Sequence, residues 1–160
     1  MSAKSIVTID QQNENLTRPA KAVTDFATDE LKNLIRDLID SMKKSDGIGI
    51  AAPQINVSQQ VIIVNTDSGP LSLINPKIIA RSIRREDGEE GCLSVPGVYG
   101  IVPRHRKIRV TGYDIKGNKQ MIKAEGLFAR VLQHEIDHIN GILFIKKTKE
   151  ITRGKESLTI

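Results

Sequence analysis

Two histidines four positions apart, near the end of the chain, constrain its fold more than any other feature. His134 and His138 flank Glu135 in the pattern His-Glu-x-x-His. In an α-helix, side chains at positions i and i+4 lie roughly 40° apart on the same side, so both imidazoles can bind one metal ion. Glu135 is then offset on the helix surface, where it can act on water at the metal. The pattern therefore predicts a helix that carries a hydrolytic metal centre.

A lone cysteine, Cys92, offers the third ligand. A single cysteine is usually a small buried apolar residue. Here Gly91 relaxes the backbone before it, residues 93–95 continue as strand-like sequence, and Pro96-Gly97 predicts a turn. A thiolate and two imidazoles leave the fourth tetrahedral position open, which is typical of a catalytic site. One cysteine also excludes an internal disulfide and fits a reducing compartment.

The first regular element that the sequence predicts is an amphipathic helix. Its apolar stripe repeats at i, i+3, i+4, i+7, i+8 and i+11 and consists of Leu31, Leu34, Ile35, Leu38, Ile39 and Met42. Thr28 is a suitable N-cap, and the acidic residues Asp29 and Glu30 follow it in the first turn, where the helix dipole favours negative charge. Asp46-Gly47 is expected to end this helix.

The middle of the chain has the pattern of β-strands. We expect a short buried strand at 61–64, a strand at 71–79 that is interrupted at Pro76, and a hairpin of strands 106–114 and 119–124 joined by a turn at Gly117-Asn118. Aromatic residues make up 3% of the chain, so Ile, Val and Leu must fill the core.

The second helix is expected to run from residue 125 or 126 through His138 and to stop at Asn140-Gly141. Residues 146–160 are polar and basic, and we expect a loosely ordered tail there. Together these patterns predict one α+β domain over residues 1–160. Small mixed or antiparallel sheets should pack around the C-terminal His-Glu-x-x-His helix, with one amphipathic helix toward the N-terminus.

A glycine-rich run, Gly-Ile-Gly-Ile-Ala-Ala-Pro-Gln at residues 47–54, superficially matches a dinucleotide-binding fingerprint. The context excludes that interpretation, because a helix precedes the glycines and Pro53 leaves no room for a phosphate-binding helix. The run is either a simple turn or a backbone that can pair with an extended peptide as an added strand. In the second case Gln54 supplies an amide donor.

The chain carries a formal net charge of +5, with basic residues at 104–107, at Arg109, and again at 146–155. Such a charge can attract nucleic acid or the ribosome surface. A solvated basic face is the simpler interpretation, because no aromatic residues alternate with the charges, and no specific nucleic-acid partner is predicted. Residues 1–10 lack the apolar stretch of a signal peptide, and no apolar run reaches membrane-spanning length. We therefore expect a cytoplasmic protein without membrane contact.

Three segments together resemble the peptide deformylases. That family carries a G-x-G-x-A-A-x-Q motif, an E-G-C-L-S motif and a Q-H-E-x-D-H motif in this order, and they are matched here at residues 47–54, 90–94 and 133–138. The likeness extends from about Ile6 to Phe144 and departs from the usual pattern at Ile50, where leucine is commoner, and at Arg130, where an apolar residue is common. It implies a hydrolase that removes the N-formyl group from the N-terminal methionine of new polypeptides and releases formate.

The resemblance also implies roles for individual residues. Cys92, His134 and His138 would bind a divalent metal, most often Fe(II) in this family, although the ligands suit Zn(II), Ni(II) or Co(II) equally well. Glu135 would act as general base and then acid, while the Gln54 side chain and the Leu93 N–H stabilise the oxyanion. Substrate contacts are assigned to the backbones of Ile48, Gly49 and Gly91, to an apolar pocket of Leu127 and Val131, and to a polar border of Glu90 and Arg130.

Some details follow from the resemblance less directly. The guanidinium head of Arg130 is expected to reach solvent while its stem lines the pocket. Asp137 would either orient a metal ligand or anchor the helix. The partners implied are nascent formylmethionyl peptides and, through the basic residues, the ribosome surface. A bacterial-type cytosol is expected, and a bacterial-type organelle stays open.

Two other functions share some of these features. A zinc endopeptidase also uses His-Glu-x-x-His but takes a third ligand downstream, where no histidine or cysteine follows and only Glu150 and Glu156 remain. A basic module that binds nucleic acid or the ribosome, with a vestigial metal site, is the alternative from a different class. Loss of the metal site on Cys92→Ser substitution would separate a deformylase from the protease, and salt-sensitive RNA binding without turnover would favour the module.

Overall fold

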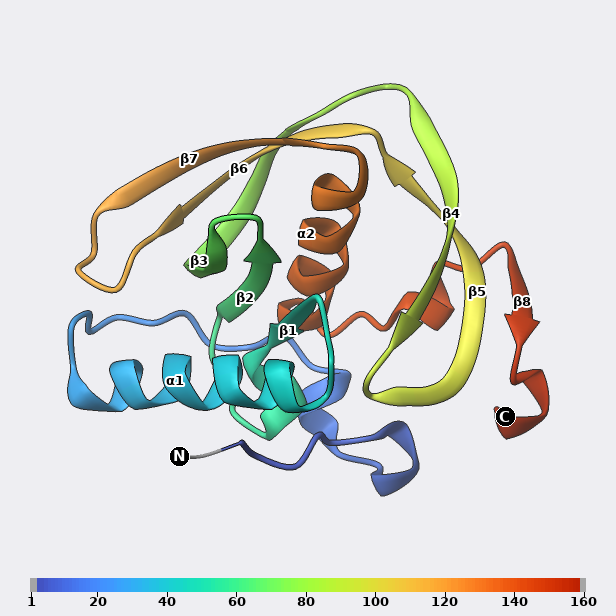
Figure 1. Ribbon diagram of the computed structural model, residues 1–160, viewed down its shortest axis with the longest axis horizontal. Coiled ribbons are helices and arrows are strands. Elements are labelled where there is room, and N and C mark those ends of the chain that lie inside the picture. The colour runs from blue at the N-terminus through green and yellow to red at the C-terminus, as the bar shows by residue number, and fades with distance from the viewer. Residues whose placement is uncertain (1–2, 159–160) are drawn as a thin grey trace.

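The computed structural model describes residues 3–158 (Figure 1), and over that range the chain forms two α-helices, eight strands and five short 3-10 helices. The α-helices are α1 (Asp29–Lys44) and α2 (Gly126–Ile139). The strands are β1 (Gly49–Ala51), β2 (Val61–Thr66), β3 (Gly69–Arg81), β4 (Arg85–Cys92), β5 (Val95–His105), β6 (Lys107–Tyr113), β7 (Lys119–Glu125) and β8 (Glu150–Arg153). The 3-10 helices are η1 (Ile9–Gln11), η2 (Glu14–Leu16), η3 (Ala52–Ile55), η4 (Phe144–Lys146) and η5 (Lys155–Ser157).

Helix α1 follows the pattern predicted from the sequence. The Thr28 hydroxyl accepts a hydrogen bond from the backbone N–H of Leu31 at 3.1 Å, which satisfies one of the free donors of the first turn. The apolar stripe is buried along Leu31, Leu34, Leu38 and Met42. The helix therefore forms because a capped start and a continuous apolar face agree with each other.

The larger sheet is antiparallel and has the strand order β1-β2-β3-β6-β7. Strand β2 is apolar on both faces because both faces are covered: Ile62 and Val64 pack in the core shared with α2, while Val61 and Ile63 pack in the core shared with α1. Strand β3 runs without interruption through Pro76, in contrast to the expected break. Its pairing with β6 shifts register between Ile74 and Lys77, which accommodates a residue without an N–H.

The smaller sheet has the order β4-β5-β8 and lies on the other side of α2, so that this helix stands between the two sheets (Figure 1). Strands β4 and β5 form a hairpin whose turn is at residues 93–94, not at the expected Pro96-Gly97. Cys92 is consequently the last residue of β4 and pairs with Val95. The predicted α+β fold, with a central metal-binding helix, is confirmed.

The segment expected to be a loose tail carries regular structure up to residue 158. Strand β8 pairs with β5, and η5 follows it. Ion pairs join the basic residues of this segment to acids elsewhere: Lys147 to Asp137 at 2.9 Å and Lys149 to Asp87 at 2.8 Å. Residues 159–160 lie outside the described range. Among the described residues, neither α-helix is long and apolar enough to span a membrane.

Candidate metal centre

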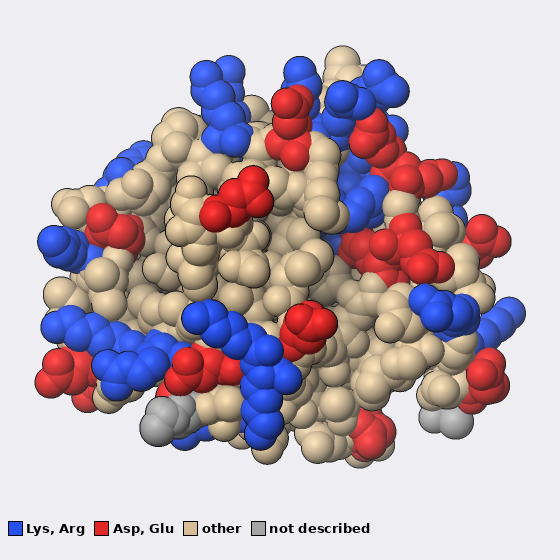
Figure 2. All heavy atoms as spheres, viewed as in Figure 1, with Lys and Arg blue, Asp and Glu red and all other residues tan. Residues whose placement is uncertain are grey.

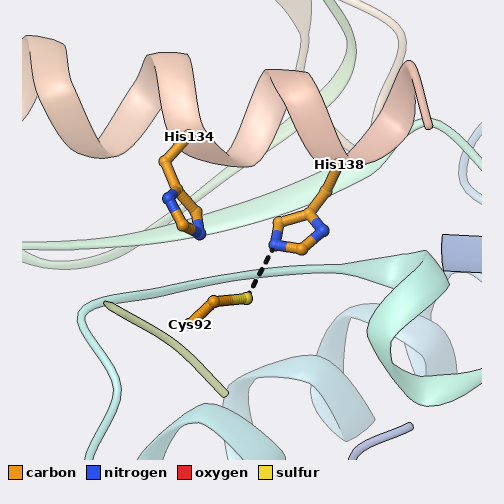
Figure 3. A group of neighbouring side chains, drawn as sticks. All are labelled: Cys92, His134 and His138. Atoms are coloured by element: carbon orange, nitrogen blue, oxygen red, sulfur yellow. Dashed lines mark hydrogen bonds between the residues drawn. The ribbon is translucent and has the colours of Figure 1, made fainter. Parts of the chain in front are cut away.

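Helix α2 and the end of β4 bring three metal-ligating side chains together. Figure 3 shows His134 and His138 pointing from the helix toward Cys92 on the facing strand. The Sγ atom of Cys92 lies 3.3 Å from Nε2 of His138, and the ligand atoms of all three residues lie within 4.8 Å of one another. One soft thiolate and two imidazoles at this spacing fit a divalent transition metal with one position left open. The predicted ligand set is therefore brought together by the fold.

The charge state of Cys92 suits metal binding. Burial favours the neutral thiol, but the neighbouring His138 and His134 more than offset this and lower the pKa of Cys92 to about 5. The thiolate is the form of cysteine that ligates metal ions. The two histidines thus favour the thiolate form in which Cys92 can act as the third ligand.

Glu90 determines how His134 presents its ring. The Oε1 atom of Glu90 is 2.8 Å from Nδ1 of His134, which turns the other ring nitrogen toward the centre. Glu90 in turn accepts two hydrogen bonds from the Arg104 guanidinium, both at 2.9 Å. Burial opposes ionisation of this carboxyl, yet Arg104 and His134 outweigh it and hold its pKa far below the usual range. Glu90 is therefore an ionised carboxylate that orients a ligand.

The role of Arg104 could not be recognised from its place in a basic run. It lies on β5, where the buried positions Val98, Gly100, Val102 and Arg104 alternate along one face of the strand. That alternation is the signal that places Arg104 in the interior, where 4% of the residue is exposed. Its Nη1 also donates to Asp137 at 2.6 Å. Within the described part of the chain, the Asp137 side chain bonds to Arg104 and Lys147, which favours the anchoring of α2 over direct orientation of a metal ligand.

Glu135 has a different environment although it too is buried, with 4% of the residue exposed. Among the described residues, its Oε2 atom has no hydrogen-bond partner. Burial raises the pKa of Glu135 to about 6, even though His134 and His138 act in the opposite direction. A buried acceptor without a partner is rare and commonly marks a functional group. Gly49 of β1 passes so close that a Cβ there would lie 2.7 Å from Oε1 of Glu135.

A cavity of about 410 Å³ opens beside these residues. It is lined by every residue predicted to act in catalysis or substrate binding, namely Gln54, Leu93, Glu135, Ile48, Gly49, Glu90, Gly91, Leu127, Arg130 and Val131, and by the ligands Cys92 and His134. His138 is almost fully buried at 1% exposure. Two apolar residues of the cavity lining are largely exposed: 56% of Ile48 and 68% of Leu127 is accessible to solvent.

The side chain of Gln54 is held in a defined orientation. Its Oε1 accepts a hydrogen bond from the N–H of Ala51 at 3.0 Å, so its amide nitrogen faces the other way. That nitrogen lies 3.2 Å from the Ser94 hydroxyl and 3.7 Å from the Cys92 sulfur. The N–H donors of Gln54 are thus directed toward the metal ligands.

Arg130 differs from its expected position. Its guanidinium is bonded within the protein and does not extend into solvent as expected: Nη1 donates to Glu90 at 2.7 Å and to the carbonyl of Val102 at 2.8 Å, and Nη2 donates to the carbonyl of Glu86 at 2.7 Å. The side chain is 14% exposed. The absence of a side chain at Gly88 makes room for it, since a Cβ there would lie 2.7 Å from the guanidinium carbon. Arg130 therefore ties α2 to the β4–β5 hairpin.

Comparison with known proteins places this geometry in context. Residues 3–154 match the sequence model of the polypeptide deformylase family. A peptide deformylase of Natranaerobius thermophilus is 44% identical over 158 residues, covering 98% of this chain and 99% of the relative. Peptide deformylase 2 of Ralstonia nicotianae is 46% identical over 151 residues, covering 88% of this chain and 85% of the relative.

Solved structures agree with the sequence relatives. The crystal structure of a peptide deformylase from Thermotoga maritima superposes with a TM-score of 0.89 at 35% identity, covering 94% of this chain and all of that one. A peptide deformylase from Synechococcus elongatus, solved in complex with actinonin, superposes with a TM-score of 0.85 at 41% identity, covering 91% of this chain and 78% of that one.

Proposed function

This chain belongs to the peptide deformylase family, and we infer from that premise how its own residues carry out the reaction. The resemblance noted in the sequence is thereby confirmed: the protein is a metal-dependent hydrolase that removes the formyl group from N-terminal formylmethionine. The observation that carries the mechanism is the convergence of Cys92, His134 and His138 beside the unpartnered oxygen of Glu135. The roles below are our assignments.

We propose that Cys92, His134 and His138 hold one divalent ion, with Fe(II) as the native metal. When bound, such an ion supplies Lewis-acid chemistry, since it polarises a carbonyl and makes water more acidic. The ligand atoms themselves suit Zn(II), Ni(II) and Co(II) as well, so our choice of Fe(II) rests on the family.

We assign to Glu135 the transfer of a proton from water to the leaving nitrogen. A pKa raised to about 6 lets the carboxylate accept a proton from water near neutral pH and release it again. Hydrolysis breaks the bond between the formyl carbon and the methionine nitrogen, so the proton must travel from water to that nitrogen while the oxygen of water passes to formate. The oxygen of Glu135 that has no hydrogen-bond partner is the atom free to carry it.

We assign to Gln54 and Leu93 the stabilisation of the negative charge that develops on the formyl oxygen. The Gln54 amide is turned toward the ligands by its bond to Ala51, and Leu93 follows Cys92 directly in the wall of the cavity. Donors that are already oriented stabilise an oxyanion without reorganising during the reaction.

The substrate peptide is proposed to extend β1, which is an edge strand of the larger sheet. The carbonyl of Ile48 accepts a hydrogen bond from the N–H of Asn65 on the inner side. Because backbone groups alternate in direction along a strand, Gly49 then presents its groups to the open edge. Of the two backbone contacts expected here, at Ile48 and Gly49, the contact at Gly49 is therefore better supported. Gly91, also in the cavity lining, is proposed to contact the peptide as well.

The methionine side chain is assigned to the apolar wall of Leu127 and Val131. The buried ion pair of Glu90 and Arg130 stands at its border as a polar limit to the pocket. Because nascent chains emerge at the ribosome, we propose a cytoplasmic enzyme that acts near the ribosome surface.

The test is formate release from a formyl-Met-Ala-Ser peptide by protein purified anaerobically and loaded with Fe(II), Ni(II) or Zn(II). We expect turnover that a chelator abolishes and that the added metal restores. Cys92→Ser should weaken metal affinity by more than about 100-fold, because a direct ligand is lost. A Cys92→Ser protein that kept its metal would favour the downstream ligand set of an endopeptidase. Full metal content without turnover would contradict the assignment and favour an inactive binding module.

A further inference from the structure

The two basic segments visible in the sequence do not form open cationic surfaces. In residues 104–107, Arg104 is buried against Glu90 and Asp137, and Arg106 pairs with Glu86 at 2.6 Å. In the C-terminal segment, Lys147, Lys149 and Arg153 each lie within 4 Å of an acidic side chain. Most of the charge in these segments is therefore neutralised within the fold.

Unpaired cations from three different strands gather at one place, and of these only Arg109 belongs to a basic cluster of the sequence. Arg81 at the end of β3, Arg109 on β6 and Lys123 on β7 are all exposed, and within residues 3–158 none of them has an ion-pair partner. They line one hollow of about 540 Å³. Lys107 lies in the same hollow beside Glu125, the only acidic side chain in its lining, at 3.7 Å. We call Arg81, Arg109 and Lys123 the cationic face.

Within the cationic face, Arg109 and Lys123 lie on the outer side of the larger sheet, whereas Arg81 pairs in register with Ile108 and lines the hollow from the end of β3. The residues that alternate with Arg109 and Lys123 along β6 and β7, Ile108, Val110 and Ala124, pack inward against α2. Figure 2 shows lysine and arginine side chains, with some acidic ones among them, projecting from the upper margin of the molecule, where Figure 1 places the β3–β4 connection, β6 and β7. The register of the hairpin therefore directs Arg109 and Lys123 outward.

The register also places two cations directly opposite each other. Arg109 and Lys123 are cross-strand partners in the β6–β7 ladder. Like charges at directly opposed positions destabilise a sheet. An anion bound between them would remove that repulsion, so this pair favours an anionic ligand.

A second hollow, of about 680 Å³, has Arg81 in its lining as well. Lys77 and Arg85 add two exposed cations there. Its only acidic lining residue, Asp137, is already bonded to Arg104 and Lys147. Positive charge therefore extends around the end of β3 without an acid to oppose it.

We propose that the cationic face binds the phosphate backbone of RNA without reading its sequence. Arginine and lysine contacts to phosphates position a nucleic acid but do not distinguish bases. Phe, Tyr and Trp do not line either hollow, and the imidazole that does, His105, is held at 2.8 Å by the carbonyl of Ser82, which argues against base stacking and for a backbone contact. A chain of closely spaced phosphates releases condensed counterions on binding, which gives RNA an advantage over a flexible acidic peptide. Only the biological setting of this inference rests on the proposed site of action near the ribosome.

The test compares two variants that each lose three positive charges. Arg81→Gln/Arg109→Gln/Lys123→Gln removes the cationic face, and Lys32→Gln/Arg36→Gln/Lys43→Gln removes three exposed cations from α1 as the matched control. Binding of a fluorescein-labelled 20-nucleotide RNA is followed by fluorescence anisotropy at several salt concentrations. For the unmodified chain we expect a Kd of about 10 µM at about 50 mM salt.

The cationic-face variant should bind at least about tenfold more weakly, and its dependence of log Kd on log salt should flatten by about 2, whereas the control should stay within about twofold. Both variants should release formate from the short peptide at the unmodified rate, which shows that they fold and separates this test from that of the proposed function. Equal weakening of both variants would overturn the inference, as net charge alone would then explain binding. So would a Kd above about 100 µM for the unmodified chain, or competition by polyglutamate as effective as RNA of equal charge.

Discussion

Glu90 and Glu135 are two buried carboxylates of the same metal centre, and they meet opposite environments. Glu90 accepts hydrogen bonds from Arg104 and Arg130 and holds His134, so both of its oxygens are engaged. Its pKa is lowered in spite of burial. Glu135 keeps an oxygen without a partner among the described residues, and its pKa rises to about 6.

The difference between the two environments gives Glu90 a positioning role and leaves Glu135 free to transfer protons. A carboxylate surrounded by donors stays ionised and holds its neighbours in place, because any loss of a partner would leave a buried charge uncompensated. A carboxylate with a free oxygen can exchange a proton at little structural cost. The first should matter to folding and metal affinity, and the second to turnover.

The largest effect is expected from Glu135→Gln. Because the amide cannot carry the proton, kcat should fall by at least about 1,000-fold, which corresponds to about 4 kcal/mol. Metal content should remain complete, and the midpoint of thermal unfolding should not decrease, since no hydrogen bond to the free oxygen is lost. Formate release, metal analysis and calorimetry measure the three quantities. A variant that kept a tenth of the activity would remove the distinction between the two carboxylates.

Glu90→Gln should show the converse pattern. It takes a buried carboxylate from both Arg104, which keeps only Asp137, and Arg130, so the metal-free protein should lose about 3 kcal/mol of unfolding free energy in urea. Metal affinity should also fall by about 10- to 100-fold, because His134 is no longer held by a carboxylate. A competing chelator titrates that affinity. Loss of kcat alone, with stability and metal binding intact, would show that Glu90 belongs with Glu135 after all.

Arg130→Met should have the smallest effect of the three. Glu90 keeps Arg104 and His134, while the carbonyls of Val102 and Glu86 lose a donor, so the cost should be about 1–2 kcal/mol in unfolding free energy. Arg106→Met is the matched control, because its half-exposed pair with Glu86 should contribute less than about 1 kcal/mol. Equal effects of the two substitutions in urea unfolding would contradict a specific link between α2 and the hairpin.

Local patterns predicted a large part of this protein correctly. The stripe from Leu31 to Met42 and its Thr28 cap predicted α1, and the spacing of His134 and His138 predicted that α2 carries two ligands on one side. The turn between β6 and β7 and the short strand β2 were also recognisable. Each of these depends on residues within about one or two turns of each other, which is the range that periodicity and capping describe.

Apart from the turn expected at Pro96-Gly97, which lies at residues 93–94, the expectations that failed depend on contacts between distant segments. Pro76 was expected to interrupt a strand, yet pairing with β6 carries β3 through it. The tail was expected to be loose, yet β5 offers an edge to β8. The head of Arg130 was expected in solvent, yet Glu90 lies 40 residues away in sequence and 2.7 Å away in space.

By itself, then, the sequence determined which residues could ligate a metal, because ligand chemistry and helical spacing are local properties. Only the tertiary structure decided which carboxylate is paired and which is free, where the basic segments are neutralised and where cations stay open. Burial and charge compensation depend on which strands and helices pack together, and these contacts join segments that are dozens of residues apart in the sequence. Glu90 and Glu135 are both glutamates within their sequence motifs, and the neighbours that the fold brings to them give them different roles.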